Sequence, residues 1–125
     1  MDISITIAKL KNTELVDLKF ENDGYGQFRN SFTQTEKYSL FSNFKFQHTL
    51  QTTTQMGYYS GGLNEKKRSG VWSIESPRFS DINKEACLVL KYDDGEVLKH
   101  GILRGKGYVI LDSKRYEWNR ISGFL

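Results

Sequence analysis

Aromatic and cationic residues gather around one glycine-rich segment in the middle of the chain. Between Gly57 and Gly70 the sequence contains Gly61-Gly62 and three consecutive cations, which predicts an exposed loop. Rings beside cations stack bases and neutralise phosphates in single-stranded nucleic-acid sites, and Tyr, Trp and Arg also dominate protein–protein contacts. The sequence therefore predicts a binding surface, with a protein as the favoured partner, made of Tyr58, Tyr59, Lys66, Lys67, Arg68 and Trp72.

The same residues also have a purely structural interpretation. Trp72 lies in the alternating run Gly70 to Glu75 between polar neighbours, and this pattern predicts a buried indole in a strand. The three cations would then belong to a solvated loop. Because a loop of this length inside a compact domain is uncommon unless it is functional or disordered, we expect it to contact an acidic or phosphate-bearing partner.

Nucleophilic and acid–base catalysis find little support in the sequence. Cys87 lies in the apolar run Ala86 to Leu90, where a thiol usually packs as a small hydrophobic group, and no Gly-x-Ser-x-Gly motif occurs. The carboxylates of Asp93, Asp94 and Glu96 cluster at an expected turn, where we expect neither burial nor a charged neighbour to shift their pKa values. We therefore expect no enzyme activity and no cofactor.

Metal binding is also unsupported. The two histidines, His48 and His100, are far apart in the sequence and have no cysteine or carboxylate partners at the spacing of a zinc site or a two-metal site. A single histidine on a strand is usually hydrogen-bonded rather than metal-bound. The sequence therefore predicts no metal site.

Composition limits the class of protein. The chain has 125 residues, of which 38% are hydrophobic and 26% charged, with a net charge of +3, as expected for one globular domain spanning residues 1–125. The single cysteine excludes an internal disulfide, and the N-terminus lacks the features of a signal peptide. We therefore expect a cytoplasmic protein without a membrane partner.

The hydrophobic pattern predicts mostly strands. Period-2 alternation is clear in several runs, and Asp-Gly and Gly-x-Gly sequences between them are typical of tight turns. The stretch from Phe28 to Phe32 is expected to be irregular, and Ser80 to Ala86 is the best candidate for one short helix. A bend or bulge is expected near the threonines of the longest strand. The expected strands are Ile3–Ile7, Leu15–Phe20, Phe44–Met56, Gly70–Glu75, Cys87–Tyr92, Val97–Arg104, Tyr108–Leu111 and Arg115–Ile121.

The fold class that follows is all-β and mainly antiparallel, as a small barrel or sandwich with a C-terminal meander. The favoured function is a non-catalytic binding module for another macromolecule, most of all a protein. Two alternatives stay open. The trio Gly70-Val71-Trp72 resembles the Gly-x-Trp strand of the calycin families, which would imply a barrel holding a small apolar ligand, although the calycin motif lies near the N-terminus. An OB-like domain would instead bind single-stranded nucleic acid.

Overall fold

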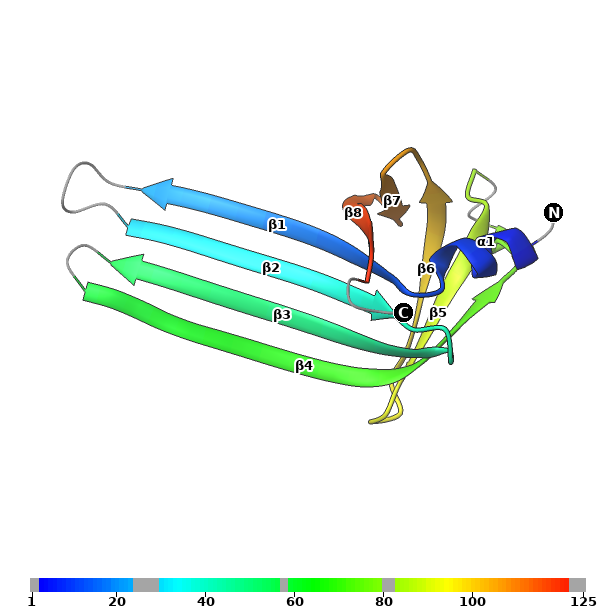
Figure 1. Cartoon of the computed structure of the whole chain (residues 1–125), viewed down its shortest axis with the longest axis horizontal. Coiled ribbons are helices and arrows are strands. Elements are labelled where there is room, and N and C mark those ends of the chain that lie inside the picture. Colours follow the sequence, from blue (N-terminus) through cyan, green and yellow to red (C-terminus); the bar gives the residue numbers. More distant parts are fainter. Residues whose placement is uncertain (1–2, 24–29, 57–58, 80–82, 122–125) are drawn as a thin grey trace.

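The computed structural model describes residues 3–23, 30–56, 59–79 and 83–121. Eight antiparallel strands follow one another around a closed barrel, and the last strand pairs with the first (Figure 1). This confirms the predicted all-β, mainly antiparallel fold, and of the two predicted architectures, barrel and sandwich, the structure has the barrel. The elements are α1 (Ile3–Leu10), β1 (Thr13–Asp23), β2 (Asn30–Leu40), β3 (Lys45–Met56), β4 (Tyr59–Glu75), β5 (Ala86–Tyr92), β6 (Val97–Arg104), β7 (Tyr108–Leu111) and β8 (Lys114–Arg120).

The N-terminal segment is a helix, so the predicted strand Ile3–Ile7 is wrong. In α1 the buried residues are Thr6 and Leu10, four positions apart and therefore on one side of the helix. The side chains of Ile3 and Ile7 also pack against the core. Positions 3 and 7 fit both the strand period and the helix period, and the burial of Leu10 is what selects the helix.

The barrel interior is filled with side chains. Leu10 of α1 joins a core of large residues from all eight strands, and Cys87 is fully buried as predicted. Trp72 is 1% exposed, and its Nε1–H donates to the carbonyl oxygen of Phe41 at 3.0 Å. The largest fully buried side chains are Trp72, Phe46, Leu10, Leu15, Leu40, Leu88, Leu90 and Ile102.

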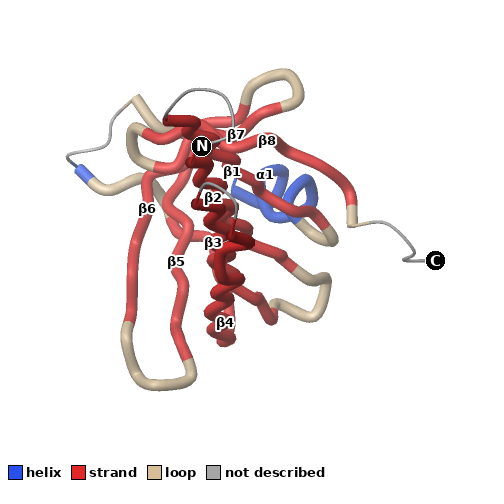
Figure 2. Tube along the Cα trace, turned by 90° about the vertical axis from the view of Figure 1, so that its left-hand side faces the viewer, coloured by secondary structure: helices blue, strands red, loops and turns tan. Residues whose placement is uncertain are grey.

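The first four strands are much longer than the barrel is deep. β8 pairs with β1 only from Thr13 to Val16, and β5 pairs with β4 only from Gly70 to Glu75. Beyond these points the four strands continue as a sheet that we call the arm: residues 17–23, 30–36, 48–56 and 59–68. The arm projects from the barrel in Figure 1 and is seen end-on as a single layer in Figure 2. No described side chain of the arm is buried.

The described parts of two segments that were predicted to be irregular are strands of the arm. The predicted loop between Gly57 and Gly70 is wrong, because the chain from Tyr59 onward is β4, paired with β3. Phe32 lies in β2, whereas Phe28 is outside the described residues. Charged residues and glycines suggested a loop, yet a sheet exposed on both faces needs no apolar alternation.

Of the remaining predictions of local structure, the structure confirms two and does not support a third. The irregularity expected near the threonines is confirmed by a register shift between Thr53 and Gln55. The turns of the C-terminal meander are also confirmed, with positive φ at Gly95 and Gly107. The predicted helix Ser80–Ala86 is not supported by its described part, since residues 83–85 form a turn and a bend and Ala86 begins β5. Its first three residues lie outside the described ranges.

Candidate functional site

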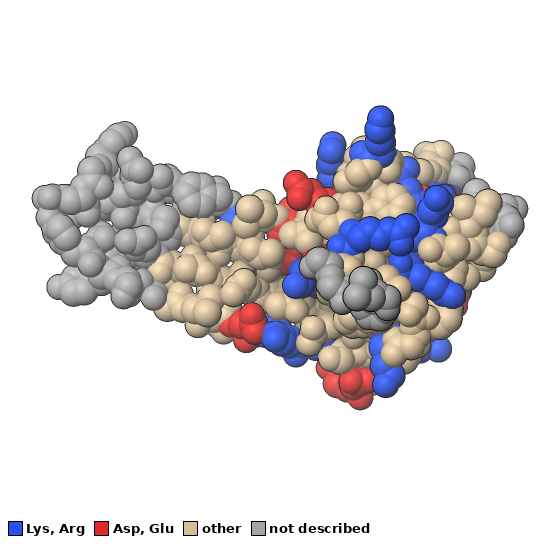
Figure 3. Space-filling model, in the orientation of Figure 1, with Lys and Arg blue, Asp and Glu red and all other residues tan. Residues whose placement is uncertain are grey.

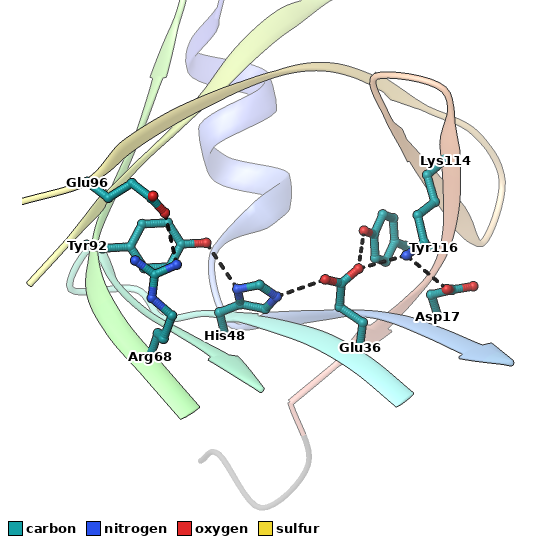
Figure 4. A network of polar contacts seen from close by, with 8 residues as sticks. All are labelled: Asp17, Glu36, His48, Arg68, Tyr92, Glu96, Lys114 and Tyr116. Atoms are coloured by element: carbon teal, nitrogen blue, oxygen red, sulfur yellow. Dashed lines mark hydrogen bonds and ion pairs between the residues drawn. The ribbon is translucent and has the colours of Figure 1, made fainter. Parts of the chain in front are cut away.

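A chain of polar contacts crosses the barrel where the arm begins (Figure 4). Each arm strand contributes one residue near its base: Asp17 of β1, Glu36 of β2, His48 of β3 and Arg68 of β4. The register explains the alignment, because Asp17 lies opposite Glu36 and His48 lies opposite Arg68. All four side chains lie on the face of the arm that continues the barrel interior, which we call the inner face.

Glu36 is the centre of this network. Its Oε2 lies 3.0 Å from Nε2 of His48, while its Oε1 accepts hydrogen bonds from Lys114 Nζ at 2.8 Å and from the Tyr116 hydroxyl at 2.6 Å. The hydrogen bond with His48 lowers the pKa of Glu36 far below its usual range, with further lowering by Lys114 and Tyr116, although burial opposes the shift. Glu36 is therefore a carboxylate at neutral pH.

His48 extends the network towards β5. Its Nδ1 lies 3.0 Å from the hydroxyl of Tyr92, and its ring stacks on Tyr38 with centroids 4.1 Å apart and planes 17° from parallel. Both ring nitrogens are therefore engaged, and stacking fixes the plane of the ring. His48 thus links the base of the arm to the barrel wall.

Arg68 completes the link on the other side of Tyr92. Its guanidinium lies 3.8 Å from the centroid of the Tyr92 ring, and it donates to Asp94 Oδ2 at 2.7 Å and to Glu96 Oε1 at 2.9 Å. The acidic turn after β5 therefore has a cationic neighbour, contrary to the expectation from the sequence. The pKa of Asp94 is lowered, chiefly by a hydrogen bond from the Glu96 backbone and then by Arg68.

The shifted groups of the network keep their ordinary charge at neutral pH. Burial raises the pKa values of the Tyr38 and Tyr116 hydroxyls, so both stay protonated. Burial opposes the charge of Lys114, but hydrogen bonds to Glu36 and Asp17 raise its pKa above the usual value. The hydrogen bonds and ion pairs of the network join side chains of β1, β2, β3, β5 and β8.

The described members of the predicted binding surface lie in different surroundings. Tyr58 lies outside the described residues, Tyr59 begins β4, and Trp72 is buried in the core. Alternation along β4 places Lys66 on the inner face with Arg68, and Lys67 on the outer face, where its Nζ lies 3.3 Å from Glu65 Oε1. Both lysines are exposed.

Lys66, Lys67 and Arg68 lie along one edge of β4 that no other strand in the described part of the chain covers. From Tyr59 to Arg68 the strand pairs with β3 on one side, and β5 does not reach it on the other. The last backbone contact across this edge is the Asp93 N–H donating to the Ser69 carbonyl at 2.9 Å. A hollow of about 150 Å³ lies at this inner end, lined by Arg68, Ser69, Tyr92, Asp93 and Asp94.

Sequence reasoning missed Glu36, Lys114 and Tyr116 as site residues. Lys114 and Tyr116 are 78 and 80 positions from Glu36 in the chain. No local spacing links residues so far apart, and only barrel closure between β1 and β8 brings them together. The sequence did contain one indication. Glu36 is two positions from Tyr38, so in a strand the two side chains share a face, and a glutamate on the face of a large aromatic residue is expected to be partly buried.

Among the described residues, no three His, Cys, Asp or Glu side chains gather in a way that would hold a metal ion. No helix described in the structure is long and apolar enough to cross a lipid bilayer. No family model matches the chain. A search of curated proteins and a search of solved structures likewise found no match.

Proposed function

We propose that the protein is a non-catalytic binding module that takes an extended segment of a partner protein as an added strand along β4. The observation that carries this proposal is the edge of the arm from Tyr59 to Arg68, which no second strand among the described residues covers. An edge strand presents a row of backbone donors and acceptors, and an extended segment satisfies them by pairing. The network around Glu36 holds the base of this edge in place.

The side chains along the edge favour acidic segments. Lys66 and Lys67 stand on opposite faces of β4, so an added strand meets a cation whichever face its side chains occupy. Opposite charges directly across strands are stabilising, and like charges are destabilising. Lysines on an edge strand also oppose pairing with arbitrary strands of other chains. We therefore expect the edge to prefer a partner segment whose carboxylates lie opposite Lys66 and Lys67.

The two alternatives receive less support. A barrel for an apolar ligand needs interior space, and here Leu10, Trp72 and the other core side chains occupy the interior. An OB fold is a five-stranded Greek-key barrel, whereas these eight strands pair in sequence order. On the side seen in Figure 3, lysine and arginine side chains gather over the barrel, and the described part of the arm is mostly uncharged.

Site-specific photo-crosslinking in the cells of origin tests the proposal. A photoreactive residue at Leu63, which is 65% exposed on β4, is expected to capture a partner protein. The matched control is the same residue at Val97, which is 50% exposed on β6 of the barrel. Capture from Val97 alone would place the contact on the barrel and contradict strand addition.

Hydrogen exchange on the purified complex then tests the mode of binding. Backbone amides on the free edge of residues 59–68 should exchange more slowly with the partner bound, because an added strand gives them acceptors. The double variant Lys66→Glu/Lys67→Glu should bind the partner at least about tenfold more weakly. Unchanged exchange along β4 in a saturated complex would rule out strand addition even if the partner binds.

A further inference from the structure

The outer face of the sheet carries a strip of amide and hydroxyl side chains along β3. Side chains alternate between the two faces of a strand, so Lys45, Gln47, Thr49 and Gln51 share the outer face and follow one another about 7 Å apart. We call these four residues and their outer-face neighbours on the adjoining strands the polar strip. The neighbours are Thr35 and Lys37 of β2, and Glu65, Lys67 and Ser69 of β4.

Two hollows follow the polar strip. The larger encloses about 510 Å³, a volume within the range of small-molecule sites. Its walls include Lys45, Gln47 and Asp93 as polar groups, and Phe41 and Val71 as apolar groups. The smaller, of about 150 Å³, lies farther along the arm between side chains of β2, β3 and β4. Both hollows are lined by Gln47, so they adjoin and the strip is concave along its length.

The amides and hydroxyls of the polar strip have unused hydrogen-bonding capacity. Among the described residues, no hydrogen bond involves the side chains of Thr35, Gln47, Thr49, Gln51 and Ser69. Each glutamine offers two N–H donors and one carbonyl acceptor, and each hydroxyl both donates and accepts. A ligand that presents donors and acceptors at short intervals along the strand would use them all.

The charges of the polar strip are compensated within the protein. Lys67 Nζ lies 3.3 Å from Glu65 Oε1, and Lys37 Nζ lies 3.9 Å from Glu14 Oε2 of β1. The larger hollow adds one lysine and one aspartate, whose charges are opposite. Binding of nucleic acid depends on cations that neutralise phosphates, and this face has no surplus of them. A neutral ligand therefore fits the strip better than a polyanion.

The distribution of apolar groups separates a sugar from a protein as the ligand. The centre of a protein interface is usually rich in aromatic and apolar side chains, whereas the centre of the polar strip carries amides and hydroxyls. Val71, which is 47% exposed, gives the larger hollow an apolar wall at one end of the strip. A sugar ring has apolar C–H faces and a rim of hydroxyls that both donate and accept hydrogen bonds.

From this arrangement we infer that the polar strip binds a neutral oligosaccharide. One sugar unit lies in the larger hollow against Val71, and the following units lie along β3 from Gln47 to Gln51. Sugar binding here is independent of the proposed strand addition, because it uses side chains of the outer face and not the backbone edge of β4.

An array of neutral and acidic oligosaccharides, with single-stranded DNA as a further probe, tests the class of ligand. We expect the intact protein to bind neutral chains of two or more sugar units, with an affinity that changes little between about 50 mM and about 500 mM salt, because no counterions are released. Binding to no neutral oligosaccharide would overturn the inference. Binding that is confined to acidic chains or to DNA, and that is lost at high salt, would also overturn it.

Substitutions on the two faces of β3 test the place of binding. Gln47→Ala and Thr49→Val should each weaken binding of the best neutral oligosaccharide at least about threefold, and together at least about tenfold, because each removes hydrogen-bonding groups. The matched control is Thr52→Val, which removes a hydroxyl from the inner face of the same strand and should bind like the parent. Equal losses for Thr49→Val and Thr52→Val would overturn the assignment to the polar strip.

Nuclear magnetic resonance on the parent protein gives a second measurement that needs no substitution. The side-chain amide signals of Gln47 and Gln51 should shift as the same oligosaccharide is added, because their N–H groups gain hydrogen-bond partners. Shifts confined to residues outside the polar strip would overturn the inference even if the oligosaccharide binds.

Discussion

The Nε2 atom of His48 lies 3.0 Å from the Oε2 atom of Glu36, with the two side chains 17% and 18% exposed. This contact joins β3 to β2 where both strands leave the barrel. The arm itself buries no described side chain, so its orientation depends on its hydrogen-bonded strands and on contacts at its base. Glu36 and His48 are therefore expected to matter more for stability than charged residues farther out on the arm.

Replacing Glu36 with glutamine should destabilise the fold. The variant keeps the size of the side chain but removes the charge that faces Lys114, His48 and the Tyr116 hydroxyl. Hydrogen bonds to charged groups are worth more than neutral ones, so we expect the free energy of unfolding to fall by about 1–3 kcal/mol. In urea denaturation this loss of stability should appear as a lower midpoint, while the slope of the unfolding free energy against urea concentration stays unchanged.

The matched control is Glu65→Gln on the outer part of β4. The Glu65 side chain is 39% exposed, and its carboxylate pairs with Lys67 at 3.3 Å on the surface, so the change should stay within about 0.5 kcal/mol. Equal effects of the two substitutions would show that the network does not stabilise the base of the arm.

Stability should fall in acid in a way that depends on Glu36. The pKa of Glu36 in the folded chain is far below the ordinary value of 4.5. As the pH falls, the Glu36 carboxylate is therefore protonated in the unfolded chain before it is protonated in the folded chain. The contribution is complete above the ordinary pKa and is lost progressively as the pH falls from about 5. Urea midpoints of the parent and of Glu36→Gln, measured from about pH 7 to about pH 3, should therefore converge on acidification. A difference that stays constant with pH would assign the effect to packing instead.

Gly70 is the point where β4 passes from the barrel to the arm, and alanine should not be tolerated there. A Cβ atom at this position would overlap the backbone carbonyl of Lys91 and lie 2.9 Å from the Phe46 ring. Because a backbone group cannot rotate away, we expect Gly70→Ala to cost about 1–3 kcal/mol. Gly62→Ala is the control, since a Cβ there meets nothing within 4 Å. Equal urea midpoints for the two variants would mean that β4 and β5 separate easily at Gly70.

The sequence predicted strands well where one face is buried. The alternation of the long strand after Phe44 and of the C-terminal meander reflects a barrel wall with a packed interior, and Trp72 is buried as that pattern requires. It failed along the outer part of β4, although the outer part of β3, in the same arm, was predicted as a strand. Residues 59–69 show no alternation because the arm has no core, and glycines and cations there resemble a loop although pairing with β3 makes them a strand.

The candidate site was less predictable for a different reason. Of the residues in the network, the sequence predicted only Arg68 as a binding residue, and it predicted that Arg68 lies in a loop. Lys114 and Tyr116 reach Glu36 because β1 and β8 close the barrel, and closure is a long-range property that no short motif encodes. The N-terminal helix was not predicted because Ile3 and Ile7, four positions apart, share one face in a strand as well as in a helix.

The three cations of β4 should separate into two kinds. Arg68 lies over Tyr92 and binds Asp94 and Glu96, so Arg68→Glu would place a carboxylate beside two others and remove the contact with the ring. Lys66 and Lys67 are exposed on the arm, and their reversal should leave the fold nearly intact. We therefore expect Arg68→Glu to lower the urea midpoint while Lys66→Glu/Lys67→Glu leaves it close to that of the parent. The double variant is then the correct tool for testing binding along β4, because any loss of partner affinity occurs in a folded protein. The opposite order of stabilities would show that the edge lysines, and not Arg68, anchor the arm.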